Sequence, residues 1–466
     1  MKEKLLKNVY VIFTGKFFTK FKTILLLPLY TNILSSSEYG IVDLFMTYVV
    51  LLRPIVTFNV GEGVFRFLVD SRKKDKEKVK IISCGFYGIL FRFIIFLFIF
   101  FIINLFFDIQ YKFYLLLLLF VSFFSNFLLY IYKGNGNITG YTVGSFINGV
   151  SVVLFNLIFL LFFKWDIRGV LLANILGELL CILYLLFKDK TYKYIKLNKR
   201  DKVVNRKLLK YSFPLIFNSL IWWVIKVSDR TIITLFLGSS FNGIYSISCK
   251  ISNILLQLYE VFHISWLESV SININKKNVS EFFSNTFNMV LKIFMSINIV
   301  IIVILPFAFN LLVSKEFYES YYYIPLLLIS VLFNIVGSFL ENIYLAKKMT
   351  KKVFNTALLV GILNIIINVL LIKDFGIYAA VISTILSFMV MGIYRYIDIQ
   401  KYVSVKINFK ELSLFIILGI LSVIVYYCNI KIIQFIMMIV ILIIIVLLNR
   451  NIIFKFLDII KKRIVK

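Results

Sequence analysis

Ionisable side chains lie inside long apolar segments of this chain, where each requires an oppositely charged partner or a water-filled cavity. Eight of these side chains are Lys or Arg and three are Asp or Glu, so the space that they line is cationic. A cationic space of low dielectric favours an anionic ligand, and the planar fork of Arg suits a diphosphate. The charges are Lys16, Lys20, Lys22, Arg53, Glu62, Arg66, Lys226, Asp229, Arg230, Lys250 and Glu260.

The spacing of these charges leaves a second interpretation open. Glu62 and Arg66 are four residues apart and Asp229 is next to Arg230, so each couple could be a neutral pair with no role in binding. Arg53 lies near the middle of its segment, where its side chain cannot reach either membrane surface, and we favour a binding role for it. The candidates for ion coupling are Asp229, Glu260 and Glu62.

Cysteine and histidine contribute no recognisable chemistry. The four cysteines are isolated, and no spacing suits a metal or a redox centre. His263, the single histidine, is interpreted as a polar residue at the inner edge of its segment, with a proton relay as the alternative. We predict no catalytic residue, no metal and no cofactor, and we expect that the protein is not an enzyme.

The composition identifies the class of protein. Apolar residues make up 61% of the 466 residues and charged residues 16%, whereas soluble domains have about 45–50% and about 25%. A soluble enzyme, a secreted disulfide scaffold and a disordered chain are excluded, because none could accommodate so much apolar surface. The net charge of +29 is attributed to Lys and Arg beside membrane spans, so no nucleic-acid partner is expected.

The apolar segments predict an all-α membrane protein with about fourteen transmembrane helices, because an open sheet has no place in lipid. Twelve spans are the alternative, if the last apolar pair does not cross the membrane. The predicted spans are 9–33, 40–68, 80–107, 112–132, 141–163, 168–187, 211–236, 242–269, 282–312, 319–346, 353–372, 376–397, 411–428 and 432–449.

Lys and Arg are distributed unevenly between alternate connections. With the N-terminus in the cytoplasm, the inner segments hold 36 of them and the outer loops hold six. This bias predicts an even number of spans and two cytoplasmic termini in a plasma membrane. Two of the inner segments are 188–210 and 395–410. The basic, amphipathic tail 450–466 is expected to lie on the inner leaflet.

Two repeated patterns indicate an internal duplication. Residues 34–44 match residues 237–247 at five of eleven positions, and 169–173 is similar to 376–380 at nearly the same offset. Duplication of an even number of spans gives two six-helix lobes related by a pseudo-two-fold axis along the membrane normal. We predict an N-lobe at 1–200, a C-lobe at 201–405, and a C-terminal helix pair with its tail at 406–466.

Several motifs resemble those of bacterial polysaccharide flippases of the multidrug/oligosaccharidyl-lipid/polysaccharide exporter superfamily, in the O-antigen and capsule branch. The resemblance covers the opening spans of both halves, and the plan of spans matches along the whole chain. The motifs are PLYTNILSSSEYGIVDL at 28–44, the segment 53–67, YSFPLIFNSL at 211–220, Trp222-Trp223, Ser228-Asp229-Arg230, GIYS at 243–246 and Lys250-Ile251-Ser252.

The resemblance implies a V-shaped, two-lobe transporter that moves an undecaprenyl-diphosphate-linked oligosaccharide from the inner to the outer leaflet by alternating access. It also implies contacts with membrane lipids and with polysaccharide polymerase or assembly proteins. The segment 411–449 resembles the helices that form a lipid groove in the lipid II flippase branch. By the same pattern, the residues expected to hold the substrate are Arg53, Arg66, Lys226, Arg230 and Lys250.

Three other functions are weighed against this one. The main alternative is a cation-coupled small-molecule or drug antiporter of the same superfamily, which usually needs a site dominated by carboxylates. A membrane glycosyltransferase or polymerase generally needs catalytic groups on sizeable outer loops, and these loops are short. A structural assembly protein does not explain Arg53 and Lys226 near the middle of spans.

Overall fold

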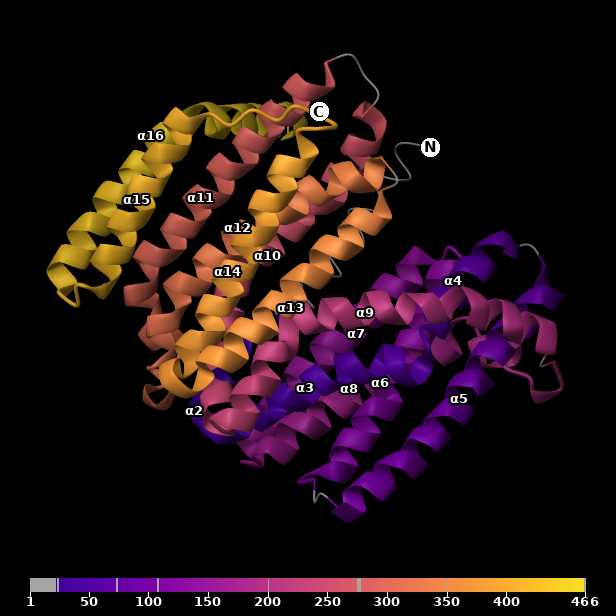
Figure 1. Cartoon of the computed structure of the whole chain (residues 1–466). Helices are drawn as coiled ribbons and strands as arrows, with labels where there is room; N and C mark the ends of the chain where they lie inside the picture. Colours follow the sequence, from indigo (N-terminus) through magenta and orange to yellow (C-terminus); the bar gives the residue numbers. More distant parts are fainter. Residues whose placement is uncertain are drawn as a thin grey trace. The chain divides into compact units, whose positions relative to one another are not determined.

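The protein is helical, with no strand, throughout the part of the chain that the structure describes. The structure is a computed structural model, and it describes residues 22, 25–72, 74–106, 109–199, 201–274, 278–347 and 349–464. The first helices (Figure 1) are α2 (Leu27–Ile33), α3 (Ser36–Thr57), α4 (Val60–Asp70), α5 (Asp75–Phe106), α6 (Lys112–Gly134), α7 (Ile138–Leu157), the π-helix η1 (Ile158–Phe162), α8 (Ile167–Lys188), the 3₁₀-helices η2 (Thr191–Tyr194) and η3 (Leu197–Lys199), α9 (Lys202–Phe236) and α10 (Ser239–Asn273). The later ones are α11 (Val279–Leu312), η4 (Lys315–Phe317), α12 (Ser320–Ala346), α13 (Thr350–Phe375), α14 (Ile377–Ile399), α15 (Phe409–Tyr427) and α16 (Lys431–Ile464).

Among the described residues, eleven helical segments are long and apolar enough to cross a membrane. They coincide with all the predicted spans except 9–33, 211–236 and 242–269. The first of these three lies largely outside the described residues, and the other two fall on α9 and α10. The predicted all-α, multi-pass membrane class is confirmed, and the total of fourteen spans stays a prediction.

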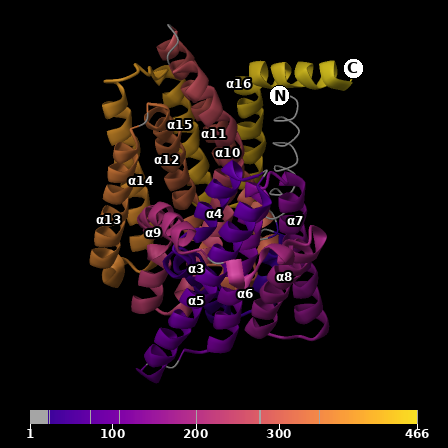
Figure 2. The same cartoon turned by 90° about the vertical axis from the view of Figure 1, so that its right-hand side faces the viewer.

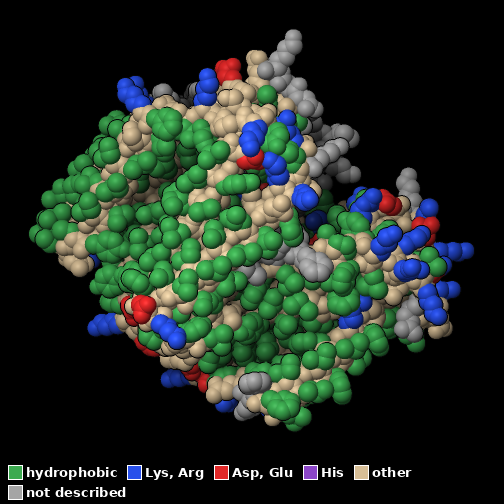
Figure 3. Space-filling view, in the orientation of Figure 1, with side chains coloured by type: hydrophobic (Ala, Val, Ile, Leu, Met, Phe, Trp, Pro, Cys, Tyr) green, Lys and Arg blue, Asp and Glu red, His purple; other side chains and the backbone are tan. Residues whose placement is uncertain are grey.

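Large apolar side chains are exposed along the spans. On α5, Phe98 is 70% exposed and Leu105 is 82% exposed, and on α15 Ile417 is 65% exposed. Lipid accepts such surface at no cost, whereas in water contiguous apolar patches of this extent are rare in monomeric proteins. Figure 3 shows apolar side chains over most of the surface in view, with Lys and Arg in a few separate groups.

The chain forms two compact units, Met1–Ser246 and Ile247–Lys466. In the first unit, α8 packs on α6 and α7, α4 packs on α6, and α9 lies along α3, α4 and α5. The division therefore falls inside α10, and α9 belongs to the same unit as α3. The lobes predicted from the sequence, 1–200, 201–405 and 406–466, are defined by the repeat and the basic linker, and they stay a prediction.

The two duplicated segments contact each other at the first turns of α3 and α10. The hydroxyls of Ser36 and Ser240 are 2.5 Å apart. A Cβ on Gly40 would overlap the carbonyl of Ser239, and a Cβ on Gly243 would overlap the carbonyl of Ser36. The glycines correspond in the repeat, as do Ser36 and Ser239, so the contact is reciprocal, as a two-fold relation requires. Small residues four apart allow this close helix crossing.

In the second unit, α14 packs against α12 and α13, and α11 packs against α15 and α16. Figures 1 and 2 both show the α15–α16 pair beside α11. Figure 2 also shows the last part of α16 turned steeply away from its first part. The amphipathic pattern predicted for 450–466 cannot be compared, because the side chains from 451 onward lie outside the described residues. The core between these helices includes Ile299, Val303, Phe415, Leu418, Ile441 and Ile445.

The basic linker predicted at 188–210 is docked on the first turns of α5. The Lys196 backbone N–H donates to the Ser83 hydroxyl at 2.9 Å, and the Asp201 backbone N–H donates to the Cys84 sulfur at 3.2 Å. Lys80 forms an ion pair with Asp201 at 2.9 Å. These contacts fix the start of α9 relative to α5.

Candidate functional site

A break divides the second predicted span next to Arg53. The sequence predicts one span over 40–68, but the structure has two helices, α3 and α4, separated by Phe58 and Asn59. These two residues have φ angles of 54° and 51°, in the left-handed region that non-glycine residues seldom adopt. Pro54, inside the last turn of α3, cannot donate the backbone hydrogen bond that would continue the helix. Non-helical backbone at membrane depth is tolerated where protein buries it or where it lines a cavity.

Arg53 points from α3 to α6 inside the first unit. Its Nη2 donates to the Ser122 hydroxyl at 2.6 Å. Its Nε is buried without a hydrogen-bond partner, and no described carboxylate forms an ion pair with it. Because a guanidinium has five N–H donors, Arg53 retains donors for an anionic ligand. Its position inside the helix bundle agrees with the sequence expectation, and its role in binding stays a prediction.

Lys22 and Glu178 lie in the same region as Arg53. Lys22 Nζ is 3.4 Å from Oδ1 of Asn148 on α7. Glu178 is at the midpoint of α8, and its charge attracts both Lys22 and Arg53. Neither cation forms a direct ion pair with it among the described residues. Glu178 is the only acidic residue in the predicted span 168–187, and it was not among the predicted site residues.

Arg92 on α5 places a further cation beside the break. Its guanidinium lies over the ring of Phe58, 5.1 Å from the centroid. Its Nε and Nη2 are buried without hydrogen-bond partners. A cation–π contact holds a guanidinium but leaves its N–H groups unsatisfied. Arg92 was not predicted as a site residue, because it lies outside the first two spans of each half.

Glu62 and Arg66 do not form the pair that their spacing allows. Arg66 pairs with Asp70 at 2.7 Å and its side chain is 48% exposed. Glu62 faces α6 and accepts a hydrogen bond from the Tyr130 hydroxyl at 3.4 Å. Gly61 permits this approach, because a Cβ there would crowd the Tyr130 ring. The interpretation of Glu62 and Arg66 as a neutral pair is therefore wrong. The Arg66 guanidinium stays exposed, which avoids the desolvation cost of burying it beside Glu62.

Arg230 is neutralised by an acid from another helix. Its Nε is 3.1 Å from Oδ2 of Asp43 on α3, and its Nη1 donates to the Thr47 hydroxyl at 3.2 Å. Asp229 instead accepts a hydrogen bond from the Tyr245 hydroxyl at 2.9 Å. Adjacent residues of a helix do not face each other, so these two take different partners. Asp43 lies within the repeated segment 34–44 and was not among the predicted site residues.

The remaining predicted residues lie on α9 and α10. The side chain of Lys226 lies outside the described ones. Lys250 and Glu260 are half-buried on α10, in the second unit, and so is His263. The structure therefore places Arg53 and Glu62 within one region of the first unit, and the binding role of every predicted residue stays a prediction.

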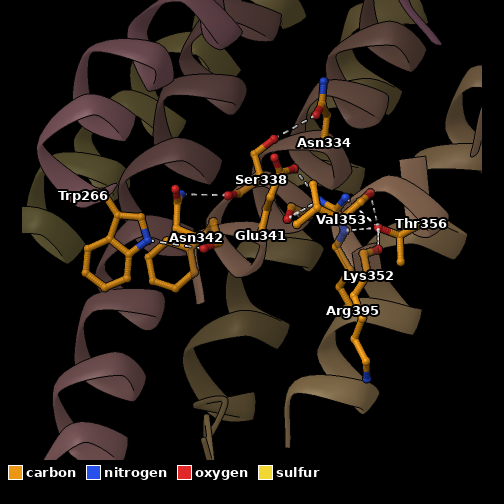
Figure 4. Close-up of polar contacts among 11 residues, drawn as sticks. Trp266, Asn334, Ser338, Glu341, Asn342, Lys352, Val353, Thr356 and Arg395 are labelled. Atoms are coloured by element: carbon orange, nitrogen blue, oxygen red, sulfur yellow. Dashed lines mark hydrogen bonds and ion pairs between the residues drawn. The ribbon is translucent and has the colours of Figure 1, made fainter. Parts of the chain in front are cut away.

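The second unit contains a buried charged cluster that sequence reasoning missed. Arg395 on α14 is fully buried, and its Nη1 donates to Glu341 on α12 at 2.8 Å. The same nitrogen donates to the carbonyl of Gly337, and Nε and Nη2 donate to the Thr356 hydroxyl at 3.0 and 2.8 Å. Figure 4 shows these groups converging from α12, α13 and α14. With its donors occupied, Arg395 joins three helices and has little capacity for a ligand.

A second ion pair lies one turn further along α14. Lys352 Nζ is 2.5 Å from Oδ2 of Asp398, which also accepts from the Tyr344 hydroxyl at 2.8 Å. The burial of Arg395 corrects one prediction, in which this residue was an inner-loop charge of the segment 395–410. It is instead a buried side chain within α14. The sequence already indicated this burial, because Arg395 lies among apolar residues and within the predicted span 376–397.

The groups around Arg53 have the chemistry that an anion requires. It offers the unsatisfied donors of Arg53 and Arg92 and the ammonium of Lys22, in an apolar bundle where charge interactions are strong. Glu62 is held by Tyr130, and Glu178 contacts neither cation directly. Among the described residues, no group of three His, Cys, Asp or Glu side chains could hold a metal ion.

Comparison with known proteins gives a family and a fold. Residues 5–267, more than half of the chain, match the family model described as polysaccharide biosynthesis protein. No curated protein matches the chain. The lipid II flippase MurJ, in an inward closed conformation, is 18% identical with a TM-score of 0.67, over 96% of this chain and 100% of that one.

Multidrug transporters share the fold as well. An inward-facing MATE family multidrug resistance transporter of the MOP superfamily is 11% identical with a TM-score of 0.68, over 82% of this chain and 95% of that chain. A MOP superfamily transporter from Pyrococcus furiosus, described as having a binding pocket of reverse polarity, is 12% identical with a TM-score of 0.53, over 85% and 95%. The fold of the MATE and MurJ transporters is thereby established for this chain.

Proposed function

The chain belongs to the polysaccharide biosynthesis protein family, and we propose that it is a flippase for an undecaprenyl-diphosphate-linked oligosaccharide. It moves this lipid from the inner to the outer leaflet of the bacterial plasma membrane by alternating access, for O-antigen or capsule synthesis. Both termini lie in the cytoplasm. Membrane lipids and polysaccharide polymerase or assembly proteins are its partners, and it catalyses no covalent reaction.

The observation that carries the proposal is the group of incompletely satisfied cations inside the first unit. Among the described residues, Arg53 and Arg92 keep buried N–H donors without partners, and Lys22 has only an amide oxygen at 3.4 Å. Burying unsatisfied cations is costly, so such groups persist where a ligand uses them. A diphosphate supplies the charge and the several oxygens that these donors require. In this proposal the remaining substrate contacts come from Arg66, Lys226, Arg230 and Lys250.

The comparisons support the proposal at the level of family and fold. A polysaccharide biosynthesis protein with the fold of a lipid II flippase is a suitable carrier for a lipid-linked glycan. The structure modifies one part of the expected site, because Arg230 already has Asp43 as its counter-ion. We therefore assign Arg53 a larger share of the binding energy than Arg230.

A cation-coupled drug or small-molecule antiporter is the second candidate, since the fold is also that of MATE transporters. In that function the acidic candidates Asp229, Glu260 and Glu62 would bind the coupling ion. The charge around Arg53 opposes it, because a cationic interior repels the organic cations that such antiporters carry.

A binding experiment separates the two functions. The purified full chain in detergent is heated with undecaprenyl diphosphate, with neutral undecaprenol, or with tetraphenylphosphonium as a model organic cation. Ligands that bind the folded state raise the unfolding temperature, and at equal concentration the tighter ligand raises it more. The flippase proposal expects stabilisation by the diphosphate alone. Stabilisation by the organic cation alone would contradict it and favour the antiporter.

A further inference from the structure

The basic linker 188–210 carries exposed lysines at a regular spacing of three residues. They are Lys190, Lys193, Lys196, Lys199 and Lys202, and all five are exposed. The backbone N–H of Lys193 donates to the carbonyl of Lys190 at 2.9 Å, and that of Lys199 donates to the carbonyl of Lys196 at 3.2 Å. These bonds close 3₁₀ turns, in which residues three apart lie on the same side. The two lysines of each turn therefore point the same way.

The acids of the linker do not neutralise these lysines. Asp201 pairs with Lys80 of α5 at 2.9 Å, and Asp189 accepts a hydrogen bond from the Asn137 side-chain amide at 2.7 Å. Among the described residues, none of the five lysines forms an ion pair. A row of like charges without counter-ions attracts an anionic partner.

Exposed apolar side chains alternate with the lysines. Tyr192 is 46% exposed, Leu197 is 54% exposed and Val203 is 63% exposed. The connection between α14 and α15 differs, because its apolar residues Val403 and Val405 are buried. Lysines interspersed with exposed apolar side chains are typical of a segment at the membrane surface, where the charges meet headgroups and the apolar groups enter the acyl boundary.

The linker is held where α5 enters the membrane. Ser83 on α5 accepts the Lys196 backbone N–H at 2.9 Å and donates to the carbonyl of Tyr194 at 3.0 Å. Helix α5 has 32 residues and is roughly 48 Å long, whereas the hydrocarbon core is about 30 Å thick. With Phe106 at the outer boundary of the core, Ser83 lies within about one turn of the inner boundary. The linker is therefore at the depth of the lipid headgroups.

We propose that this face of the linker, the five lysines with the three exposed apolar side chains, binds anionic phospholipid headgroups of the inner leaflet. The lysines bind the phosphates, and Tyr192, Leu197 and Val203 enter the boundary with the acyl chains. A soluble acidic protein would suit the lysines but would leave the apolar side chains at headgroup depth unexplained. The inference rests on the cytoplasmic orientation in the proposed function, and it shares no residue with the groups around Arg53.

Lipid retention tests the charge part of the inference. The purified full chain is placed in nanodiscs with equal amounts of phosphatidylglycerol and phosphatidylcholine, and the lipids that stay bound on release are counted by native mass spectrometry. Wild type should retain phosphatidylglycerol in preference. The triple variant Lys193→Gln, Lys196→Gln and Lys199→Gln should lose this preference by about tenfold or more, because each lysine near the lipid surface adds to the attraction.

The connection between α14 and α15 supplies a matched control. Lys401→Gln, Lys406→Gln and Lys410→Gln together remove the same charge from exposed positions and should leave the preference unchanged. An equal loss of preference in both triple variants, or no loss in the linker variant, would overturn the inference.

A depth measurement tests the apolar part without removing any lysine of the linker. A nitroxide is attached to Leu197→Cys in a chain whose four native cysteines are changed to serine. Its collisions with a neutral nickel chelate should decrease when phosphatidylglycerol replaces part of the phosphatidylcholine, since the linker then lies closer to the bilayer. A nitroxide on Lys401→Cys should not change. Equal access of the chelate to Leu197 in both lipids would contradict the inference.

A soluble polyanion separates the two kinds of partner. Stabilisation of wild type by poly-glutamate but not by phosphatidylglycerol would assign the face to an acidic protein and overturn the lipid inference. Failure of the inference leaves the flippase proposal intact, because that proposal depends on Arg53 and undecaprenyl diphosphate. Failure of undecaprenyl diphosphate to bind would overturn the flippase proposal and leave the lipid preference of the linker as measured.

Discussion

At the residue scale, the structure separates charges that have counter-ions from charges that do not. The sequence placed both Arg53 and Arg230 inside the membrane, and it predicted their sign and depth. It could not show that Asp43 neutralises Arg230 while Arg53 has only Ser122 among the described residues, because partners come from helices distant in sequence. For the same reason, spacing along one helix was a poor predictor of ion pairs, and the Glu62–Arg66 pair does not form.

Arg53 is therefore the side chain whose loss should matter most for transport. We expect Arg53→Ala to reduce surface glycan export by about tenfold or more, since a hydrogen bond to a charged group contributes about 1.5–3 kcal/mol. Arg53→Lys should be intermediate, because it keeps the charge and loses the fork. The measurement is surface polysaccharide per cell at matched protein levels. Arg168→Ala, in the exposed first turn of α8, is the control, and normal export by Arg53→Ala would disprove the cationic site.

The Lys80–Asp201 pair should make stability depend on pH. The hydrogen bond from Lys80 and the backbone N–H groups of Val204 and Val203 hold the pKa of Asp201 below its ordinary value. Because the pKa of Asp201 is lowered in the folded state, the stabilisation from its charged carboxylate is complete above the unfolded-state pKa of about 3.9. This stabilisation is lost as the pH falls through the folded-state pKa. At neutral pH the melting temperature should decrease from wild type to Asp201→Asn to Asp201→Ala, because Asn keeps the helix cap but not the charge. A gap between wild type and Asp201→Asn that persists in strong acid would contradict this account.

At the element scale, the sequence predicted the helices well and their interruptions poorly. Apolar runs predicted eleven of the segments that could span a membrane. The break at Phe58 and Asn59 was missed, since Phe seldom adopts a left-handed backbone and the single Asn, which adopts it more readily, lies within the apolar run. Pro54 gave a signal, but proline also occurs inside intact membrane helices, as Pro306 does in α11. The docking of the linker on α5 depends on Ser83 and Cys84, which carry no pattern of their own.

The reciprocal glycine crossing between α3 and α10 gives a prediction about stability. Gly40→Ala or Gly243→Ala would insert a methyl group against a backbone carbonyl, and overpacking of this kind costs about 1–3 kcal/mol. The measurement is the thermal unfolding midpoint of the detergent-solubilised protein. Gly419→Ala in α15 is the matched control, because a Cβ there meets nothing within 4 Å, and it should be neutral or slightly stabilising. Equal effects at the three glycines would mean that the crossing is not tight.

At the scale of the whole molecule, composition and charge distribution were sufficient for the class of protein. They predicted a multi-pass helical membrane protein, in agreement with the structure. The repeat identified 34–44 and 237–247 as corresponding segments, and the structure places these two segments in contact. The Glu341–Arg395 cluster could not be predicted from the sequence, because no sequence pattern relates the three helices that it joins.

Topology can be tested by cysteine labelling in a chain whose four native cysteines are changed to serine. That background is necessary because Cys428 is exposed. Lys164→Cys and Lys315→Cys, both exposed in predicted outer loops, should react with a membrane-impermeant maleimide from outside intact cells. Asn198→Cys in the docked linker should react only after the cells are permeabilised. The reverse pattern would invert the predicted orientation.

The most direct test of the central claim is the lipid-linked glycan pool of a strain that lacks this protein, measured by mass spectrometry with surface polysaccharide scored in the same cells. The flippase account predicts that a complete oligosaccharide on undecaprenyl diphosphate accumulates while surface glycan disappears, and that wild type but not Arg53→Ala restores both. An unchanged lipid-linked pool together with intact surface glycan, in a strain with no second flippase, would contradict it.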